Sequence, residues 1–302
     1  MRIPALLLLL LSVTSCEIYQ QDRYEEFYVV ESYLVAERQL PPLRLSRTGE
    51  SGEIYLYDDL GINNAQVQIQ LLQTGPGSAV EETFSYQFGD IQTTPGVYIP
   101  TVNHDVIPER TYRLEITFPN SAELITAETI VPGAFEVLGG VRDSIVYQSS
   151  DQLEIQVSQS RYPDRQSIYI FNSISQQPLF ENITPLYSEL IDEDDLENEL
   201  ERIAKTSSGI INEGNFDINP DNSITVRYPW IAVAFFGDNQ IVAHTLDDNV
   251  YDFIRSQDVQ LGGSTLSPGE IQNVIYNIDG AIGIFGSVST DTIQTFIKRP
   301  DF

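Results

Sequence analysis

The chain has 302 residues, with 16 Lys or Arg against 44 Asp or Glu, and its formal net charge is -28 at pH 7. Such an acidic chain lacks the basic surface that binding to a nucleic-acid backbone requires, and anionic lipid headgroups do not attract it. Only two of the basic residues are lysines. An acidic surface with so little lysine is typical of proteins that stay soluble at high salt, although an ordinary acidic exported protein fits the composition as well.

The N-terminus predicts a secretory signal peptide over residues 1–15. Arg2 gives a positive start, Leu6–Leu11 form an apolar core, and small residues precede Cys16. This apolar run is shorter than the ~20 residues of a membrane-spanning helix. Cys16 is the only cysteine, so no disulfide can form within the chain. The pattern is typical of a bacterial lipoprotein, in which the thiol of Cys16 is acylated and cleavage makes it the new N-terminus.

Residues 16–26 are predicted to form a short lipidated tether, and residues 27–132 an immunoglobulin-like β-sandwich. A strand-like run covers Phe27–Val35. Apolar and polar residues then alternate in three further segments, Val67–Leu71, Phe84–Phe88 and Tyr112–Phe118. A period of two places apolar side chains on one face of a strand, and Gly- and Pro-rich turns separate the segments. Short antiparallel strands of this kind favour a sandwich.

The segment Val131–Gly133 is predicted to join this sandwich to a β-rich α+β domain over residues 133–302, with about two short helices. The strands are expected at Leu153–Val157 and Ser167–Ile174, and the helices at Leu190–Ala204 and Asp247–Arg255. The run Ile231–Phe236 is continuously apolar, which predicts a strand covered on both faces.

The sequence holds no recognisable catalytic set. It has two histidines, His104 and His244, which fall in different predicted domains, and it lacks the G-x-S-x-G nucleophile pattern. We therefore expect both histidines to be structural or exposed, and the protein to be non-enzymatic. Zinc is not expected, because Cys16 carries the lipid and no H-x-x-x-H pair exists. Pairs of carboxylates at glycosidase spacing are uninformative in so acidic a chain, which leaves a carboxylate-dependent hydrolase as an alternative.

Two further patterns have structural explanations. The oxygen ligands of Asp217, Asn219, Asp221 and Ser223 alternate as in a calcium loop, but the glycine and glutamate that an EF-hand requires are missing, so a polar turn between strands is predicted. Glycine recurs every third residue over 280–286 without the G-x-G-x-x-G phosphate pattern. These glycines are expected to let a strand bend or a second backbone approach. No metal or cofactor is predicted.

Aromatic residues are abundant, with 16 Tyr, 14 Phe and one Trp. An N-terminal group, Tyr19, Tyr24, Phe27 and Tyr28, is a candidate exposed patch for a carbohydrate or a protein partner. In a β-rich protein, however, most aromatic side chains fill the core and pair across strands, and this is the predicted role of the majority.

Several segments together resemble a known family. They are Val29–Leu34, Ala127–Pro132, Tyr251–Phe253 and Asn273–Gly286. After a lipoprotein signal, they are similar to the domain-of-unknown-function family numbered 4249, over nearly the whole mature chain. The resemblance implies a Gram-negative envelope lipoprotein of the kind often found beside TonB-dependent outer-membrane transporters. The family has no established activity, so only the role of Cys16 as lipid attachment site carries over.

The expected function is that of a lipid-anchored outer-membrane protein that binds a ligand or assists a TonB-dependent transporter in nutrient uptake. A structural or adhesive envelope protein is the first alternative, and a carboxylate-dependent glycoside hydrolase the second. An apolar-lined pocket with converging polar groups would favour ligand binding.

Overall fold

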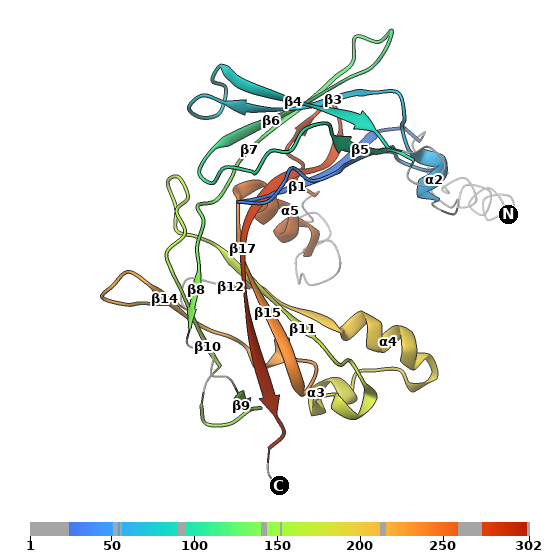
Figure 1. Ribbon diagram of the computed structural model, residues 1–302. Coiled ribbons are helices and arrows are strands. Elements are labelled where there is room, and N and C mark those ends of the chain that lie inside the picture. The colour runs from blue at the N-terminus through green and yellow to red at the C-terminus, as the bar shows by residue number, and fades with distance from the viewer. Residues whose placement is uncertain are drawn as a thin grey trace, which may run out of the picture.

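A computed structural model describes residues 24–50, 54, 56–89, 95–139, 144–151, 153–211, 216–258 and 274–300. The fold is mainly β, as predicted, with an immunoglobulin-like sandwich in the first half and a β-rich α+β arrangement in the second. Figure 1 shows the long strand β17 (Ile282–Lys298) running through both halves. The predicted signal peptide, Cys16 and most of the tether lie outside the described residues and stay predictions.

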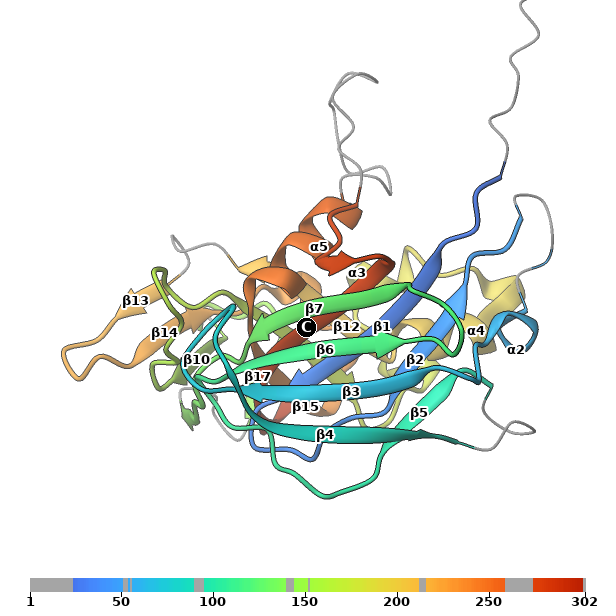
Figure 2. The ribbon, with the colours of Figure 1, turned by 90° about the horizontal axis from the view of Figure 1, so that it is seen from above.

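The first half is a two-layered sandwich. Its strands are β1 (Tyr28–Val35), β2 (Leu43–Arg47), β3 (Gln66–Leu72), β4 (Val80–Phe88), β5 (Val97–Pro100), β6 (Thr111–Thr117) and β7 (Leu124–Ile130), with a single turn of helix, α2 (Tyr57–Leu60). Seen from above, β4, β3, β6 and β7 cross over β1 and β2 (Figure 2). The predicted alternation is confirmed in β6, where Tyr112, Leu114 and Ile116 are fully buried in the first core. The residues between them are partly exposed.

The C-terminal segment closes this sandwich. The two-residue strand β16 (Ile278–Asp279) pairs with β7, and β17 pairs in parallel with β1, with Val30 opposite Gly283. Ile278 and Phe285 belong to the first core. A division of the chain at residue 132 therefore separates these two residues from the core in which they are buried.

Gly283 bears out the prediction of a close backbone approach. Its φ is 109°, in the region that side chains rarely adopt, and a Cβ at this position would collide with the carbonyl oxygen of Val30. The parallel pairing of β17 with β1 therefore requires glycine here.

Two sheets enclose the second core. One is four-stranded, in the order β13 (Phe216–Ile218), β14 (Ile224–Arg227), β10 (Glu154–Val157) and β8 (Val137–Gly139). The other continues the 13-stranded sheet from β17 through β15 (Gly237–Leu246) and β11 (Tyr169–Ser175) to β12 (Lys205–Ile211), and β9 (Ser144–Val146) pairs with the end of β17. The predicted strands near Leu153–Val157 and Ser167–Ile174 are thus confirmed, as β10 and β11.

The two predicted helices are present. The first begins as a 3-10 turn, η2 (Glu193–Asp195), and continues as α4 (Leu196–Ile203), while the second is α5 (Asp248–Asp258). Three single helical turns also lie in the described part of the second half, η1 (Phe180–Asn182), α3 (Pro185–Ser188) and η4 (Trp230–Ala232). Val250 of α5 packs with Leu246 and Ile284 on the large sheet, which fixes the helix against β15 and β17.

The prediction of a strand over Ile231–Phe236 is wrong. The segment begins in η4 and β15 starts only after it, although Ala232 to Phe236 are buried as expected. Its backbone groups are satisfied outside a ladder: the carbonyl of Ala234 accepts from the N–H of Thr184, and the N–H of Phe236 donates to the carbonyl of Asn182. A segment that is buried on both sides is apolar throughout, whether it is a strand or irregular. The apolar run therefore does not distinguish these two structures.

Candidate functional site

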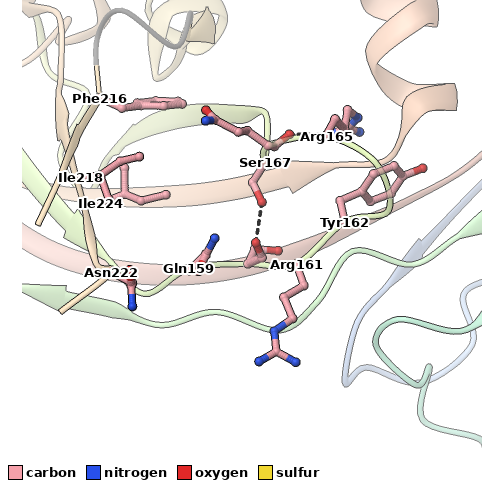
Figure 3. Close-up of a pocket in the computed structure, with 11 residues that line it drawn as sticks. Gln159, Arg161, Tyr162, Arg165, Ser167, Phe216, Ile218, Asn222 and Ile224 are labelled. Atoms are coloured by element: carbon pink, nitrogen blue, oxygen red, sulfur yellow. Dashed lines mark hydrogen bonds between the residues drawn. The ribbon is translucent and has the colours of Figure 1, made fainter. Parts of the chain in front are cut away.

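Two pockets are candidate ligand sites, one in the second half and one between the second half and β1. The first, which we call the amide-lined pocket, has a volume of about 450 Å³ and lies between the loop that precedes β11 and the β13–β14 hairpin (Figure 3). Its lining residues are Gln159, Ser160, Arg161, Tyr162, Arg165, Gln166, Ser167, Phe216, Ile218, Asn222 and Ile224.

The hairpin wall is built by the turn predicted from its polar residues. Asn222 has a φ of 65°, and the carboxylate of Asp221 accepts from the backbone N–H and the hydroxyl of Ser223 at 3.0 and 2.7 Å. These bonds hold the pKa of the Asp221 carboxyl below its usual value. The side-chain amide of Asn219 also donates to the Ser223 hydroxyl, at 2.9 Å. The motif thus forms a turn that places the apolar side chain of Ile224 beside the pocket.

The loop wall is anchored at the predicted join between the halves. The hydroxyl of Ser160 donates to the carbonyl of Gly133 at 2.6 Å, and the backbone N–H of Gly133 donates to the carbonyl of Arg161 at 2.8 Å. The hydroxyl of Ser167 then donates to the carbonyl of Ser160 at 2.8 Å, which is the dashed contact in Figure 3. Two buried serines therefore hold a loop that has no regular secondary structure.

One end of the pocket is a fixed stack of Tyr162 and Arg165. The guanidinium carbon of Arg165 lies 3.9 Å from the ring centroid of Tyr162, and its Nε donates to a carboxylate oxygen of Asp248 at 2.6 Å. The hydroxyl of Tyr162 accepts from the backbone N–H of Asp248 at 3.1 Å, and burial raises its pKa. Because the charge of Arg165 is already paired, this end presents an aromatic edge and no free cation.

The groups left for a ligand are uncharged amides and a ring. The side chains of Gln159 and Gln166 are exposed and make no hydrogen bond with another described residue. Phe216 contributes its ring from the opposite wall. Figure 3 shows the Gln159 side chain pointing into the pocket, whereas those of Arg161 and Asn222 point away from it. The arrangement suits an uncharged polar solute that stacks one apolar face on a ring.

The second pocket, which we call the apolar pocket, has a volume of about 590 Å³ and lies beside α5 on the large sheet. Its lining residues are Tyr33, Ile170, Asn172, Ser207, Gly209, His244, Leu246, Ile254 and Val288. They come from β1, β11, β12, β15, β17 and α5, so the pocket is assembled from the whole width of this part of the sheet.

A polar pair lies among these apolar side chains. The amide nitrogen of Asn172 is 2.8 Å from Nε2 of His244. Burial, followed by the nearby charge of Lys205, lowers the pKa of His244 to about 4, so the ring is neutral at pH 7. His244 was predicted to be structural or exposed, and the structure places it inside β15, half-buried and hydrogen-bonded.

His104 lies apart from His244, among residues of the first core. Its Nε2 is 2.8 Å from the hydroxyl of Tyr112, and its ring stacks on Phe84 with 4.0 Å between the centroids. Burial lowers its pKa. The two histidines therefore have different hydrogen-bond partners, Tyr112 for His104 and Asn172 for His244. His104 has the structural, hydrogen-bonded role that was predicted for it.

Among the residues that the structure describes, no group of three or more His, Cys, Asp or Glu side chains could hold a metal ion. None of the helices in this part of the chain is long and apolar enough to cross a membrane. The predicted aromatic patch is partly exposed: Tyr24 and Phe27 are at the surface, whereas Tyr28 stacks on Phe118 at 4.6 Å and packs on the first core. Tyr19 lies outside the described residues.

Neither pocket was identified from the sequence. The amide-lined pocket is formed by an irregular loop, and its residues follow no periodic pattern. The apolar pocket did leave a signal, because Asn172 lies inside the mostly apolar strand β11 and His244 directly follows the apolar stretch Ile241–Ala243 of β15. Polar side chains at such positions need hydrogen-bond partners, so the two residues indicate a polar contact on this part of the sheet.

The chain is thus a mainly β protein with two pockets that are candidate sites for small ligands. The model of the family described as "Domain of unknown function (DUF4249)" matches residues 14–294, so the chain belongs to this family. No curated protein matches the chain.

Solved structures align with it weakly. Three N-terminal domains of the highly immunogenic outer capsid protein (Hoc) of bacteriophage RB49 share 10% identity with a TM-score of 0.22, over 92% of this chain and 71% of that one. The I67–I69 fragment of the titin I-band gives 10% identity and a TM-score of 0.22, over 91% of this chain and 66% of that one. At this TM-score neither alignment bears on function.

Proposed function

We propose that the protein is a lipid-anchored lipoprotein of the outer membrane that binds a small nutrient in the amide-lined pocket and works with a TonB-dependent transporter, without catalysing a reaction. The observation that carries the proposal is the set of uncharged, unpaired groups in that pocket. Gln159 and Gln166 offer amides opposite the ring of Phe216, and apolar walls with a few polar groups are the usual composition of a small-molecule site.

Two further arguments support the cellular part of the proposal. The signal-like residues 1–15 followed by Cys16 favour a lipid anchor. The family resemblance favours a transporter partner, because lipoproteins of this kind are often found beside TonB-dependent transporters. The strongly acidic composition is consistent with a partner other than nucleic acid.

The partner is tested by affinity isolation of the tagged, lipidated protein from gently solubilised outer membrane, with mass spectrometry of what it retains. We expect a TonB-dependent transporter in near-equal amount. Recovery of the protein alone, from cells that express the neighbouring transporter, would refute the accessory role. It would shift the assignment to an independent binder or to a structural or adhesive envelope protein.

The pocket is tested separately, by the unfolding temperature of the protein in a panel of neutral oligosaccharides and short uncharged peptides. A ligand at about a hundredfold excess over its Kd should raise the unfolding temperature by roughly 5 °C. Changing Gln159→Ala and Gln166→Ala together should abolish this shift. The matched control is Gln176→Ala with Gln177→Ala, two exposed glutamines outside the pocket. Equal shifts of the unfolding temperature in both double variants would place the ligand elsewhere. Hydrolysis of an oligosaccharide by the protein would favour the alternative of a carboxylate-dependent glycoside hydrolase.

A further inference from the structure

The apolar pocket lies on the opposite face of the large sheet from the second core. Along β11, Tyr169 and Phe171 are buried in that core, whereas Ile170 and Asn172, one residue further on in each case, line the apolar pocket. Ile224 and Phe216, which line the amide-lined pocket, belong to or pack against the second core. Because successive side chains of a strand point to opposite faces, the two pockets are separate sites. An inference about the apolar pocket is therefore independent of the function proposed for the amide-lined pocket.

The lining of the apolar pocket carries no Asp, Glu, Lys or Arg, in a chain with 60 such residues. Its walls include the aliphatic side chains of Ile170, Leu246 and Ile254, together with Val288 and the ring of Tyr33. A charged ligand entering such a site would lose its hydration and find no opposite charge in the lining, because Lys205, the cation whose charge reaches His244, is exposed outside it. The lining therefore selects uncharged molecules.

The lining nevertheless offers two polar atoms. The amide nitrogen of Asn172 donates to Nε2 of His244, so a neutral ring carries its proton on Nδ1. Neither that Nδ1–H nor the amide oxygen of Asn172 makes a hydrogen bond with another described residue. One donor and one acceptor thus lie together in an otherwise mostly apolar lining, where a polar group gives a ligand specificity.

We propose that the apolar pocket binds an uncharged small molecule with an aliphatic or aromatic skeleton and a single polar group, which hydrogen-bonds to His244 and Asn172. The volume of about 590 Å³ lies within the range of roughly 300–1,000 Å³ that is typical of small-molecule sites. The apolar walls supply most of the affinity, and the polar pair orients the ligand.

The test uses phenylnaphthylamine, an uncharged dye with two aromatic groups and one N–H, whose fluorescence rises in apolar surroundings. We expect one dye molecule to bind per protein. The sulfonated anionic analogue anilinonaphthalene sulfonate should bind at least about tenfold more weakly, because no cation lines the pocket and Lys205, whose charge reaches His244, is exposed to solvent outside the lining. Equal or tighter binding of the anionic dye would overturn the assignment of an uncharged ligand.

A blocking variant locates the dye. Ser207→Phe places a ring at the exposed rim of the pocket, and it should weaken binding of phenylnaphthylamine by at least about tenfold. The matched control is Thr83→Phe, at an exposed position of β4 in the first half, and it should leave binding unchanged. Unchanged binding to a folded Ser207→Phe protein would overturn the proposal.

A measurement on the wild-type protein does not depend on how Ser207→Phe folds. The chain has two histidines, so their ring signals in an NMR spectrum are readily assigned with His244→Gln as reference. Titration with phenylnaphthylamine should shift the ring signals of His244 and leave those of His104 in place. A dye that binds without moving the His244 signals, or that fails to bind, would refute the site.

Discussion

Asp247 is fully buried where α5 meets both β7 and β17, and changing it gives a direct test of how the fold depends on pH. One carboxylate oxygen accepts from the backbone N–H of Val250 at 2.8 Å and so caps α5. The other oxygen is hydrogen-bonded by the hydroxyl of Thr129 and lies 3.4 Å from that of Ser287. Burial raises the pKa of this carboxyl from 3.8 to about 7, against the lowering effect of these hydrogen bonds.

The sign of the stability effect follows from proton binding. Between pH 3.8 and about 7 the folded protein keeps a proton on Asp247 that the unfolded chain releases, so the stability contributed by this group is fully present at low pH and is lost as pH rises through 7. At ~1.4 kcal/mol for each pH unit, the shift corresponds to a loss of about 4 kcal/mol. An asparagine at this position is neutral at every pH and can still cap α5.

We therefore expect Asp247→Asn to stabilise the protein relative to wild type by an amount that grows with pH, from near zero at pH 4 to about 4 kcal/mol at pH 8. The assay is denaturant unfolding of both proteins across this range at constant ionic strength. His244, with its pKa of about 4, has the opposite slope, because it destabilises the fold as pH falls below 6.5, but it is present in both proteins and cancels in the difference. The control Asp238→Asn removes an exposed carboxylate and should keep the slope of wild type. Parallel curves for Asp247→Asn and wild type would refute the reasoning.

Three further changes test other parts of the structure. Gly283→Ala forces a side chain against the Val30 carbonyl at a positive φ, and it should lower the free energy of unfolding by more than about 3 kcal/mol in denaturant unfolding. The control Gly75→Ala has open space around its Cβ and should lower this free energy by less than about 1 kcal/mol. Tyr98→Phe removes a buried hydroxyl that bonds two backbone groups, and a loss of about 1–3 kcal/mol by the same assay is expected, so an unchanged midpoint would contradict the observed bonds. Cys16→Ala should move the protein from the membrane to the soluble fraction and abolish labelling with radioactive palmitate; retention of either would exclude this residue as the lipid attachment site.

Local patterns in the sequence predicted much of the secondary structure. Strands with one buried face, such as β6, keep a strict alternation because a slip of one residue would expose the whole apolar set. Helix α5 was expected at Asp247–Arg255 and forms at Asp248–Asp258. The apolar run Ile231–Phe236 misled because a segment buried on both sides carries no periodicity, and hydrogen bonds to residues near 183 decide its shape.

The pockets were harder to predict because they depend on contacts between distant parts of the chain. The amide-lined pocket is formed by the loop around Ser160, the join at Gly133 and the hairpin at Asn222. Neither the order of these residues in the chain nor their type predicts that they come into contact. The polar pair of the apolar pocket joins Asn172 to His244 on neighbouring strands. The sequence could show that each was a polar residue in a strand, but their pairing follows from the register of β11 with β15.

Strand β17 belongs to both halves of the structure, so a single boundary along the chain does not divide them. Its first part pairs with β1 over Val29–Val35, and its second part pairs with β15 over Gly237–Leu246, so one continuous strand contributes Phe285 to the first core and Ile297 to the second. Cutting the chain at residue 132 would expose the edge of β1 and remove apolar surface from the first core. The apolar pocket lies where this strand passes from one half to the other, between Tyr33 and the second-half strands. A ligand bound there would contact both halves, and its binding would be sensitive to any change in how β17 spans them.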